Sequence, residues 1–299
     1  MRKAFFLGVA GSFFFAFTFL LNRSMDLSGG SWIWSGCLRF FFAFPMLLLI
    51  VRKRHGFENV HRAIRKNPGA WLLWSTVGFG LFYAPLCYAG SHAESWLIAS
   101  SWQLTIVMGI FMAPLFGKRI PLKNLLAAII ILAGVFLLQW NDIAHLKVQS
   151  LALTLLPILI GAVSYPLGNR KMMAVCDGRL STIERTYGMI LCSLPFWGIL
   201  AVPGLLMDGL PSSAQALQSF CVALFSGVIA TLLFFRATDL VKRNQKQLAV
   251  IESTQAGEVV FTLLGGALLL GDALPSPIGF AGIVLILAGM ILNSYLSAR

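Results

Sequence analysis

Long apolar runs recur along the whole chain and are separated by short connections that hold most of the charged residues. Each run has roughly 18 to 24 residues, and a helix of that length, at ~1.5 Å per residue, crosses a hydrocarbon core ~30 Å thick. The pattern therefore predicts an all-α integral membrane protein with ten transmembrane helices. The expected spans are 3–22, 31–51, 69–90, 94–117, 122–140, 150–169, 182–202, 215–235, 248–270 and 277–297.

The composition leaves no room for a water-soluble domain. Hydrophobic residues make up 58% of the 299 positions and charged residues 11%, whereas soluble domains have about 45–50% and about 25%. The net charge of +12 does not indicate nucleic-acid binding, because the basic residues lie in connections between apolar runs and form no continuous basic face. The lipid bilayer is the expected partner, and we take the apolar stretch after Met1-Arg2-Lys3 as an uncleaved first span rather than a signal peptide.

The five cysteines show no C-x-x-C spacing, and four of them lie inside apolar runs, where Cys behaves as a small hydrophobic residue. We expect no disulfide, no metal and no cofactor.

The basic residues also predict the orientation of the spans. With ten spans both termini lie on one side, and 20 of the 23 Lys and Arg residues fall on that side. Arg23 and Lys147 fall on the other side, and Arg39 lies within span 2. The positive-inside rule therefore places both termini in the cytoplasm of a bacterial-type inner membrane.

Short sequence matches link the two halves of the chain in the same order. They are Asn22-Arg23-Ser24-Met25 with Asn169-Arg170-Lys171-Met172, Gly117-x-x-x-Pro121 with Gly271-x-x-x-Pro275, and Leu132-Ala133-Gly134 with Leu287-Ala288-Gly289. Chance similarity between Gly- and Leu-rich helices is the alternative. We expect two five-helix repeats, 1–149 and 150–299, and an odd number of spans inverts the second repeat relative to the first.

Several motifs together resemble the ten-span exporters of the drug/metabolite transporter superfamily. They are Leu38-Arg39-Phe40, Ser100-Ser101-Trp102-Gln103, Phe235-Arg236-Ala237, Gly257-Glu258-Val259-Val260-Phe261 and Leu270-Gly271-Asp272. With Asn22-Arg23-Ser24-Met25 and Gly30-Ser31-Trp32-Ile33-Trp34 they are similar to the branch of multidrug resistance efflux transporters. The resemblance covers essentially the whole chain and implies export. Lys118 replaces a family Glu, and Val259 replaces a family Pro, which argues against a hinge in span 9.

Two ionisable residues lie near the middle of expected spans, where charge is costly and therefore suggests function. Arg39 lies about nine residues into span 2 and Glu258 about eleven residues into span 9. Either protonation of Glu258 couples to solute movement, or Arg39 and Glu258 form a permanent structural ion pair. The register of the repeat makes Gln103 the counterpart of Glu258. Glu252, two helical turns before Glu258, lines the same path or is solvated at the interface.

Aromatic side chains supply a second set of candidates. Trp102 lies beside Gln103, and together with Tyr83, Tyr187 and Trp34 it offers ring faces for a flat or cationic solute. Core packing is the alternative for each of these four residues.

These features favour a secondary active exporter of small organic solutes, such as drugs or aromatic and amphipathic metabolites, that works by alternating access around a central cavity. Proton coupling is one mechanism, and a facilitative metabolite or amino-acid exporter without coupling is the alternative. The chain lacks G-x-x-x-x-G-K-[ST]. A membrane-embedded lipid-modifying enzyme is disfavoured because the four His residues are scattered, and we expect no enzymatic activity. Because both repeats lie in one chain, a monomer suffices, with a homodimer as the alternative.

Overall fold

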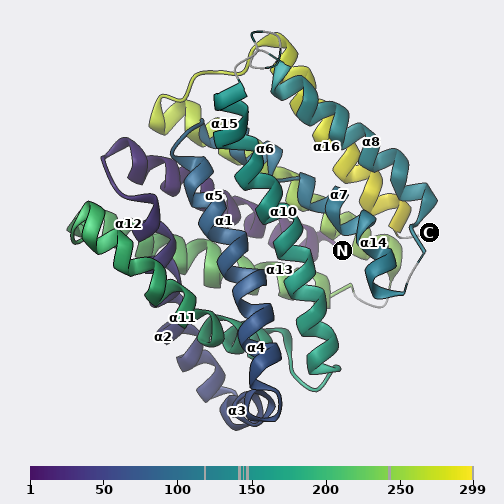
Figure 1. Cartoon of the computed structure of the whole chain (residues 1–299). Helices are drawn as coiled ribbons and strands as arrows, with labels where there is room; N and C mark the ends of the chain where they lie inside the picture. Colours follow the sequence, from purple (N-terminus) through teal and green to yellow (C-terminus); the bar gives the residue numbers. More distant parts are fainter. Residues whose placement is uncertain (118, 141–142, 144, 146–147, 242–243, 298–299) are drawn as a thin grey trace.

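The computed structural model describes all 299 residues except 118, 141–142, 144, 146–147, 242–243 and 298–299 (Figure 1). Five of the basic residues used to predict the orientation lie outside the described residues: Lys118, Lys147, Lys242, Arg243 and Arg299.

The regular elements of the described part are all helical. They are α1 (Arg2–Leu27), α2 (Trp32–Lys53), α3 (Phe57–Lys66), α4 (Pro68–Ser75), η1 (Thr76–Gly80), α5 (Leu81–Gly90), α6 (Ser95–Ser101), α7 (Leu104–Phe111), η2 (Ala113–Phe116), α8 (Leu122–Leu138), α10 (Val148–Cys176), α11 (Thr182–Asp208), α12 (Ser213–Val222), η3 (Ala223–Ala230), α13 (Thr231–Asp239), α14 (Gln245–Ser253), η4 (Thr254–Ala256), α15 (Gly257–Gly265), η5 (Gly266–Leu270) and α16 (Pro277–Ser297).

Eight helical segments of the described residues are long and apolar enough to cross a membrane. They are Arg2–Leu27, Trp32–Lys53, Pro68–Gly90, Val148–Cys176, Thr182–Asp208, Ser213–Asp239, Val250–Leu270 and Pro277–Ser297. Shorter apolar helices, Ser95–Phe111 and Leu122–Leu138, lie at the fourth and fifth expected positions. The prediction of a multi-pass all-α membrane protein is confirmed, with eight helices of spanning length.

The outside of the bundle is apolar, as a lipid solvent requires. Large hydrophobic side chains on several spanning helices are almost fully exposed, including Phe6 (73%), Leu206 (79%) and Leu268 (80%). Backbone polar groups in hydrocarbon must be satisfied within the segment, and continuous helices do this. The strongly amphipathic α3 differs, and it lies at the lower edge of Figure 1 with Val60 turned inward.

Several spans are interrupted near their middle. α6 gives way to α7 at Trp102 and Gln103, and α14 is separated from α15 by the 3₁₀ segment η4. Spans 3 and 8 each contain a π-helical segment, η1 and η3. Non-ideal turns inside helices often mark functional sites. Span 9 changes to a 3₁₀ turn at Thr254–Ala256 without any proline, and the absence of a hinge there stays a prediction.

Helices α8 and α16 pack directly against each other along the right of Figure 1. Their contact depends on glycine, because a Cβ atom on Gly134 would lie 2.7 Å from Gly282 O and 2.7 Å from Ile286 Cγ1. A backbone oxygen cannot move away as a flexible side chain can. The absence of side chains at these positions therefore sets the separation of the two helices.

Candidate functional site

A cavity of about 450 Å³ lies between the helices of the bundle. Its lining comes from α1, α2, η1, α5, the turn between α6 and α7, α7, α10, α11, η3, α13, η4 and α15. Neither α8 nor α16 contributes, since these two helices pair with each other. The cavity therefore contacts both halves of the chain, and a volume of this size suits a small organic molecule.

Three of the residues singled out from their position in the sequence, Arg39, Gln103 and Glu258, line this cavity together. Gln103 lies in the turn between α6 and α7, and Glu258 in the first turn of α15, directly after η4. Both side chains therefore project from places where a membrane helix is interrupted. Half-helix termini in discontinuous membrane helices are common places for polar solute sites.

The Arg39 guanidinium lies over the ring of Tyr83 and donates a hydrogen bond to the hydroxyl group of Ser226. Its Cζ lies 4.0 Å from the centre of the Tyr83 ring, and its Nη2 donates to Ser226 Oγ at 3.3 Å. Tyr83 is fully buried and is fixed in turn by Asn22, whose Nδ2 donates to the phenol oxygen at 3.0 Å. Tyr83 therefore contacts and positions Arg39 but does not itself line the cavity.

Arg39 and Glu258 form no ion pair in the described residues, since no nitrogen of Arg39 lies within 4.0 Å of a Glu258 oxygen. The alternative of a permanent structural pair is therefore not the arrangement found here. Both groups face the same cavity with space between them.

Aromatic rings form much of the remaining wall. Phe82, Trp102 and Tyr165 make a cluster in which the ring centres lie 5.0 Å (Phe82–Trp102), 4.8 Å (Phe82–Tyr165) and 5.7 Å (Trp102–Tyr165) apart. Phe40, which also lines the cavity, stacks on Trp197 with ring centres 4.5 Å apart. Rings packed in this way are rigid and present apolar faces.

Three other candidates lie away from the cavity. Trp34 Nε1 donates to Gly209 O at 2.8 Å, and Tyr187 is buried against Phe44. Glu252 is exposed on the outside of α14. Of the eight candidates, four line the cavity, and one of the others, Tyr83, lies directly behind the lining residues Arg39, Phe40 and Phe82.

Sequence reasoning did not single out several residues that line the cavity, including Tyr165, Asn169, Ser226 and Gln255. Asn169 carried a signal, because it begins the repeated tetrad and is the counterpart of Asn22. Arg185 at the start of α11 also lines the cavity. The others are common residues of membrane helices and carried no distinguishing pattern.

A second polar group, which we call the Asp272 cluster, joins Arg23, Ser95 and Asp272. Asp272 Oδ2 accepts hydrogen bonds from Ser95 N–H at 2.9 Å and from Ser95 Oγ at 2.5 Å. Its Oδ1 lies 3.5 Å from Arg23 Nε, and its side chain is 1% exposed. The cluster connects the end of α1 and the start of α6 to the loop before α16. Asp272 belongs to the motif Leu270-Gly271-Asp272, but nothing in the sequence indicated its partners Arg23 and Ser95.

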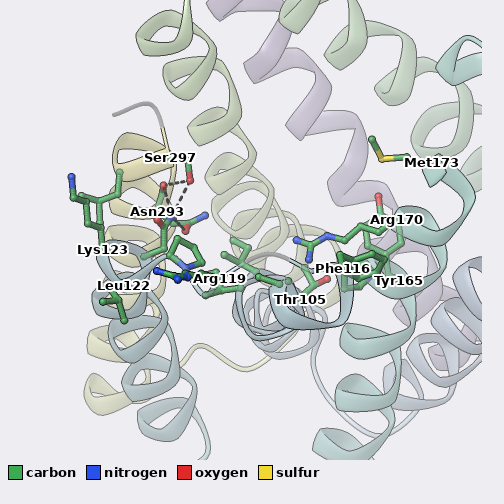
Figure 2. A pocket seen from close by; sticks show the side chains of 18 residues that line it. Thr105, Phe116, Arg119, Leu122, Lys123, Tyr165, Arg170, Met173, Asn293 and Ser297 are labelled. Carbon is green, nitrogen blue, oxygen red and sulfur yellow. Dashed lines mark hydrogen bonds between the residues drawn. The ribbon is translucent and has the colours of Figure 1, made fainter. Parts of the chain in front are cut away.

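A larger pocket of about 1260 Å³ lies beside the cavity and shares Thr105, Ile106 and Tyr165 with it. In Figure 2 the α10 residues Tyr165 and Arg170 face Lys123 and Asn293 across the pocket, with Thr105 between them. Its charged lining residues are the cations Arg119, Lys123 and Arg170. The pocket leads from the basic end of the bundle toward the cavity.

Comparisons with known proteins agree with this architecture. The model of the EmrE family, described as "Putative multidrug resistance efflux transporter", matches residues 2–299. The chain is 48% identical over 308 aligned positions to "Uncharacterized protein YjlA" of Bacillus subtilis (strain 168), covering 99% of this chain and 95% of that protein. It is 44% identical over 268 positions to "Uncharacterized 42.1 kDa protein in intracellular alkaline protease 3'region" of Shouchella clausii, covering 86% and 70%.

A solved structure named "Crystal structure of protein" matches with a TM-score of 0.63 and 16% identity, covering 99% of this chain and 98% of that chain. This likeness concerns the fold alone. The resemblance to efflux transporters of the drug/metabolite transporter superfamily, based on motifs around Arg39, Gln103 and Glu258, is confirmed by the family match over nearly the whole chain. The chain therefore belongs to the EmrE family of multidrug resistance efflux transporters, which is a family of transporters and not of enzymes.

Proposed function

We propose that the protein is a secondary active exporter that moves a small organic solute, such as a drug or an aromatic metabolite, by alternating access to the central cavity. The observation that carries this proposal is the cavity itself, in which Arg39, Gln103 and Glu258 meet rigid aromatic walls at the middle of the bundle. Polar and titratable groups inside an apolar helix bundle cost free energy, and a pocket that contains them is typical of a solute pathway.

We also propose that residues 1–149 and 150–299 form two inverted five-helix repeats with ten spans in total. The surroundings of Gly289 support this, because a Cβ atom there would lie 3.1 Å from Ala127 O and 2.6 Å from Ile131 Cγ1. Each of these contacts corresponds, after a shift of 155 residues, to a contact of Gly134 in α8. Such reciprocal contacts are expected when two equivalent helices meet at a two-fold axis.

The interruptions of the helices also fall at equivalent positions in the two proposed repeats. The turn at Gln103 corresponds to the region of Glu258, and the π-helical segment η1 of span 3 corresponds to η3 of span 8. Gly117 and Gly271, in the repeated Gly-x-x-x-Pro motif, both adopt left-handed conformations, with φ of 69° and 68°. The repeat would place the cavity at the interface between the two halves.

Under the predicted orientation, both termini lie in the cytoplasm of a bacterial inner membrane, and the Asp272 cluster lies on the outer side. The cluster then closes the outer end, and the pocket of Figure 2, with Arg119, Lys123 and Arg170, lies on the cytoplasmic side. We infer that the conformation is closed to the outside and that solute reaches the cavity past Thr105 and Tyr165. Outward release requires separation of Asp272 from its partners.

For coupling, we propose that Glu258 carries the exchangeable proton. It is the one acidic residue that lines the cavity, and it has no ion-pair partner among the described residues. A carboxyl group in this setting can change its protonation without breaking a salt bridge.

Flux measurements in proteoliposomes test both proposals. Purified protein is reconstituted, and movement of aromatic solutes is followed with and without a pH gradient. We expect gradient-stimulated flux in the wild type and only gradient-independent flux in Glu258→Gln. Glu252→Gln is the matched control, because Glu252 lies on the same span but outside the cavity. Absence of flux for all solutes would contradict the transporter, whereas equal flux with and without a gradient in the wild type would indicate a facilitator.

A further inference from the structure

The charged groups of the cavity are unbalanced. Among the residues that the structure describes, two guanidinium groups, those of Arg39 and Arg185, line it together with a single carboxyl group, that of Glu258. If Glu258 carries a proton, the cavity contains two positive charges and no negative charge. A solute with an ammonium group would then enter a site of its own sign, at a depth where water screens charge poorly.

Arg39 has hydrogen-bonding capacity that the protein does not use. A guanidinium carries five N–H donors, and the hydrogen bond that the structure gives this one runs from Nη2 to Ser226 Oγ. The Nη1 atom is buried and has no hydrogen-bond partner. The Tyr83 ring covers one face of the group, and the part of the Arg39 side chain that lines the cavity is left for a ligand.

A half-buried cation with an unused donor inside an apolar bundle is costly unless a ligand neutralises it. A carboxylate matches a guanidinium fork with two parallel hydrogen bonds, and such bonds are stronger than those between neutral groups. The rest of a ligand would contact rings, since nine aromatic side chains line the cavity of about 450 Å³: Phe15, Phe19, Phe40, Phe79, Phe82, Trp102, Tyr165, Phe234 and Phe235.

We propose that the solute is an organic acid with an aromatic body, bound through its anionic group to Arg39. This inference rests on the proposed function and adds the charge of the solute to it.

Three probes of similar size and different charge test the proposal: 3-phenylpropionate, 3-phenylpropanol and 2-phenylethylamine. Equilibrium binding of each radiolabelled probe is measured on the purified full-length protein in detergent. Because a hydrogen bond to a charged group is considerably stronger than one between neutral groups, we expect the carboxylate to bind about tenfold or more tightly than the alcohol. The amine is expected to bind more weakly than the alcohol.

Variants test which residue causes the preference for the carboxylate over the alcohol. Arg39→Gln should reduce the advantage of the carboxylate over the alcohol to about twofold or less, since the free donors that match the acid are lost. Arg39→Lys should keep part of it. Arg236→Gln is the control, because Arg236 is exposed and does not line the cavity.

Tighter binding of the amine, binding of none of the three probes, or an unchanged carboxylate preference in Arg39→Gln would overturn the proposal. The outcome is separable from that of the flux assay. Transport of the amine but not of the carboxylate would refute the proposal that the solute is an anion, but it would still agree with the proposed transport function. Absence of flux for all solutes would refute the transport function itself.

Discussion

Replacing Asp272 by Asn should open the outer end of the bundle. The carboxylate accepts two hydrogen bonds from Ser95 on Oδ2, its Oδ1 forms an ion pair with Arg23 Nε at 3.5 Å, and its side chain is 1% exposed. Asparagine has nearly the same shape, but one of its oxygens is replaced by an NH₂ group, which is itself a donor. The amide can therefore satisfy Ser95 or Arg23 but not both.

The size of the effect follows from the burial of the pair. Removing one partner of a buried ion pair costs about 3–5 kcal/mol, and we take about 3 kcal/mol because asparagine keeps one hydrogen bond. At about 1.4 kcal/mol for each factor of ten, the population of the open outer end should rise about 100-fold.

Hydrogen exchange followed by mass spectrometry measures this change, because exchange of protected amides reports local opening. In Asp272→Asn we expect faster exchange in 92–101 and 266–273 and unchanged exchange in α8 and α16. Asp26→Asn is the control. Asp26 contacts the same arginine at 3.1 Å but is 28% exposed, and exposed pairs contribute at most about 1 kcal/mol.

The reasoning would be refuted if Asp272→Asn accelerated exchange in these two segments no more than Asp26→Asn does. Uniform acceleration over the whole chain would indicate general destabilisation and would also contradict a local role for the cluster.

Three further predictions concern packing and the cavity wall. Gly134→Val should lower thermal stability by about 1–3 kcal/mol because its Cβ would meet Gly282 O at 2.7 Å, whereas Gly198→Val, with open space around it, should have little effect on the same thermal unfolding curve. Trp102→Leu should weaken binding of an aromatic solute about fivefold, as loss of ring contacts of about 1 kcal/mol implies, and equal binding would argue against its place in the wall. Trp34→Phe removes a hydrogen bond worth about 1 kcal/mol and should lower the unfolding temperature without altering solute affinity.

The length and spacing of the apolar runs determined the fold class and the positions of the helices. All ten expected segments are helical in the described residues. Length and hydrophobicity are local properties of the sequence, and they alone decide whether a segment matches the thickness of a bilayer. The scarcity of intramembrane charge also indicated Arg39 and Glu258, and both line the cavity. These predictions needed no knowledge of how the helices pack.

The tertiary structure decided which helix faces meet. The sequence predicted that Tyr83 and Tyr187 would both offer ring faces to a solute, yet one supports Arg39 and the other packs against Phe44 outside the cavity. Asp272 was recognised only as part of a motif, and its partner Ser95, 177 residues earlier in the chain, came from the fold. Contacts of this kind depend on the rotation and separation of helices, which are set jointly by many side chains and by glycines such as Gly134, and no local sequence window contains that information.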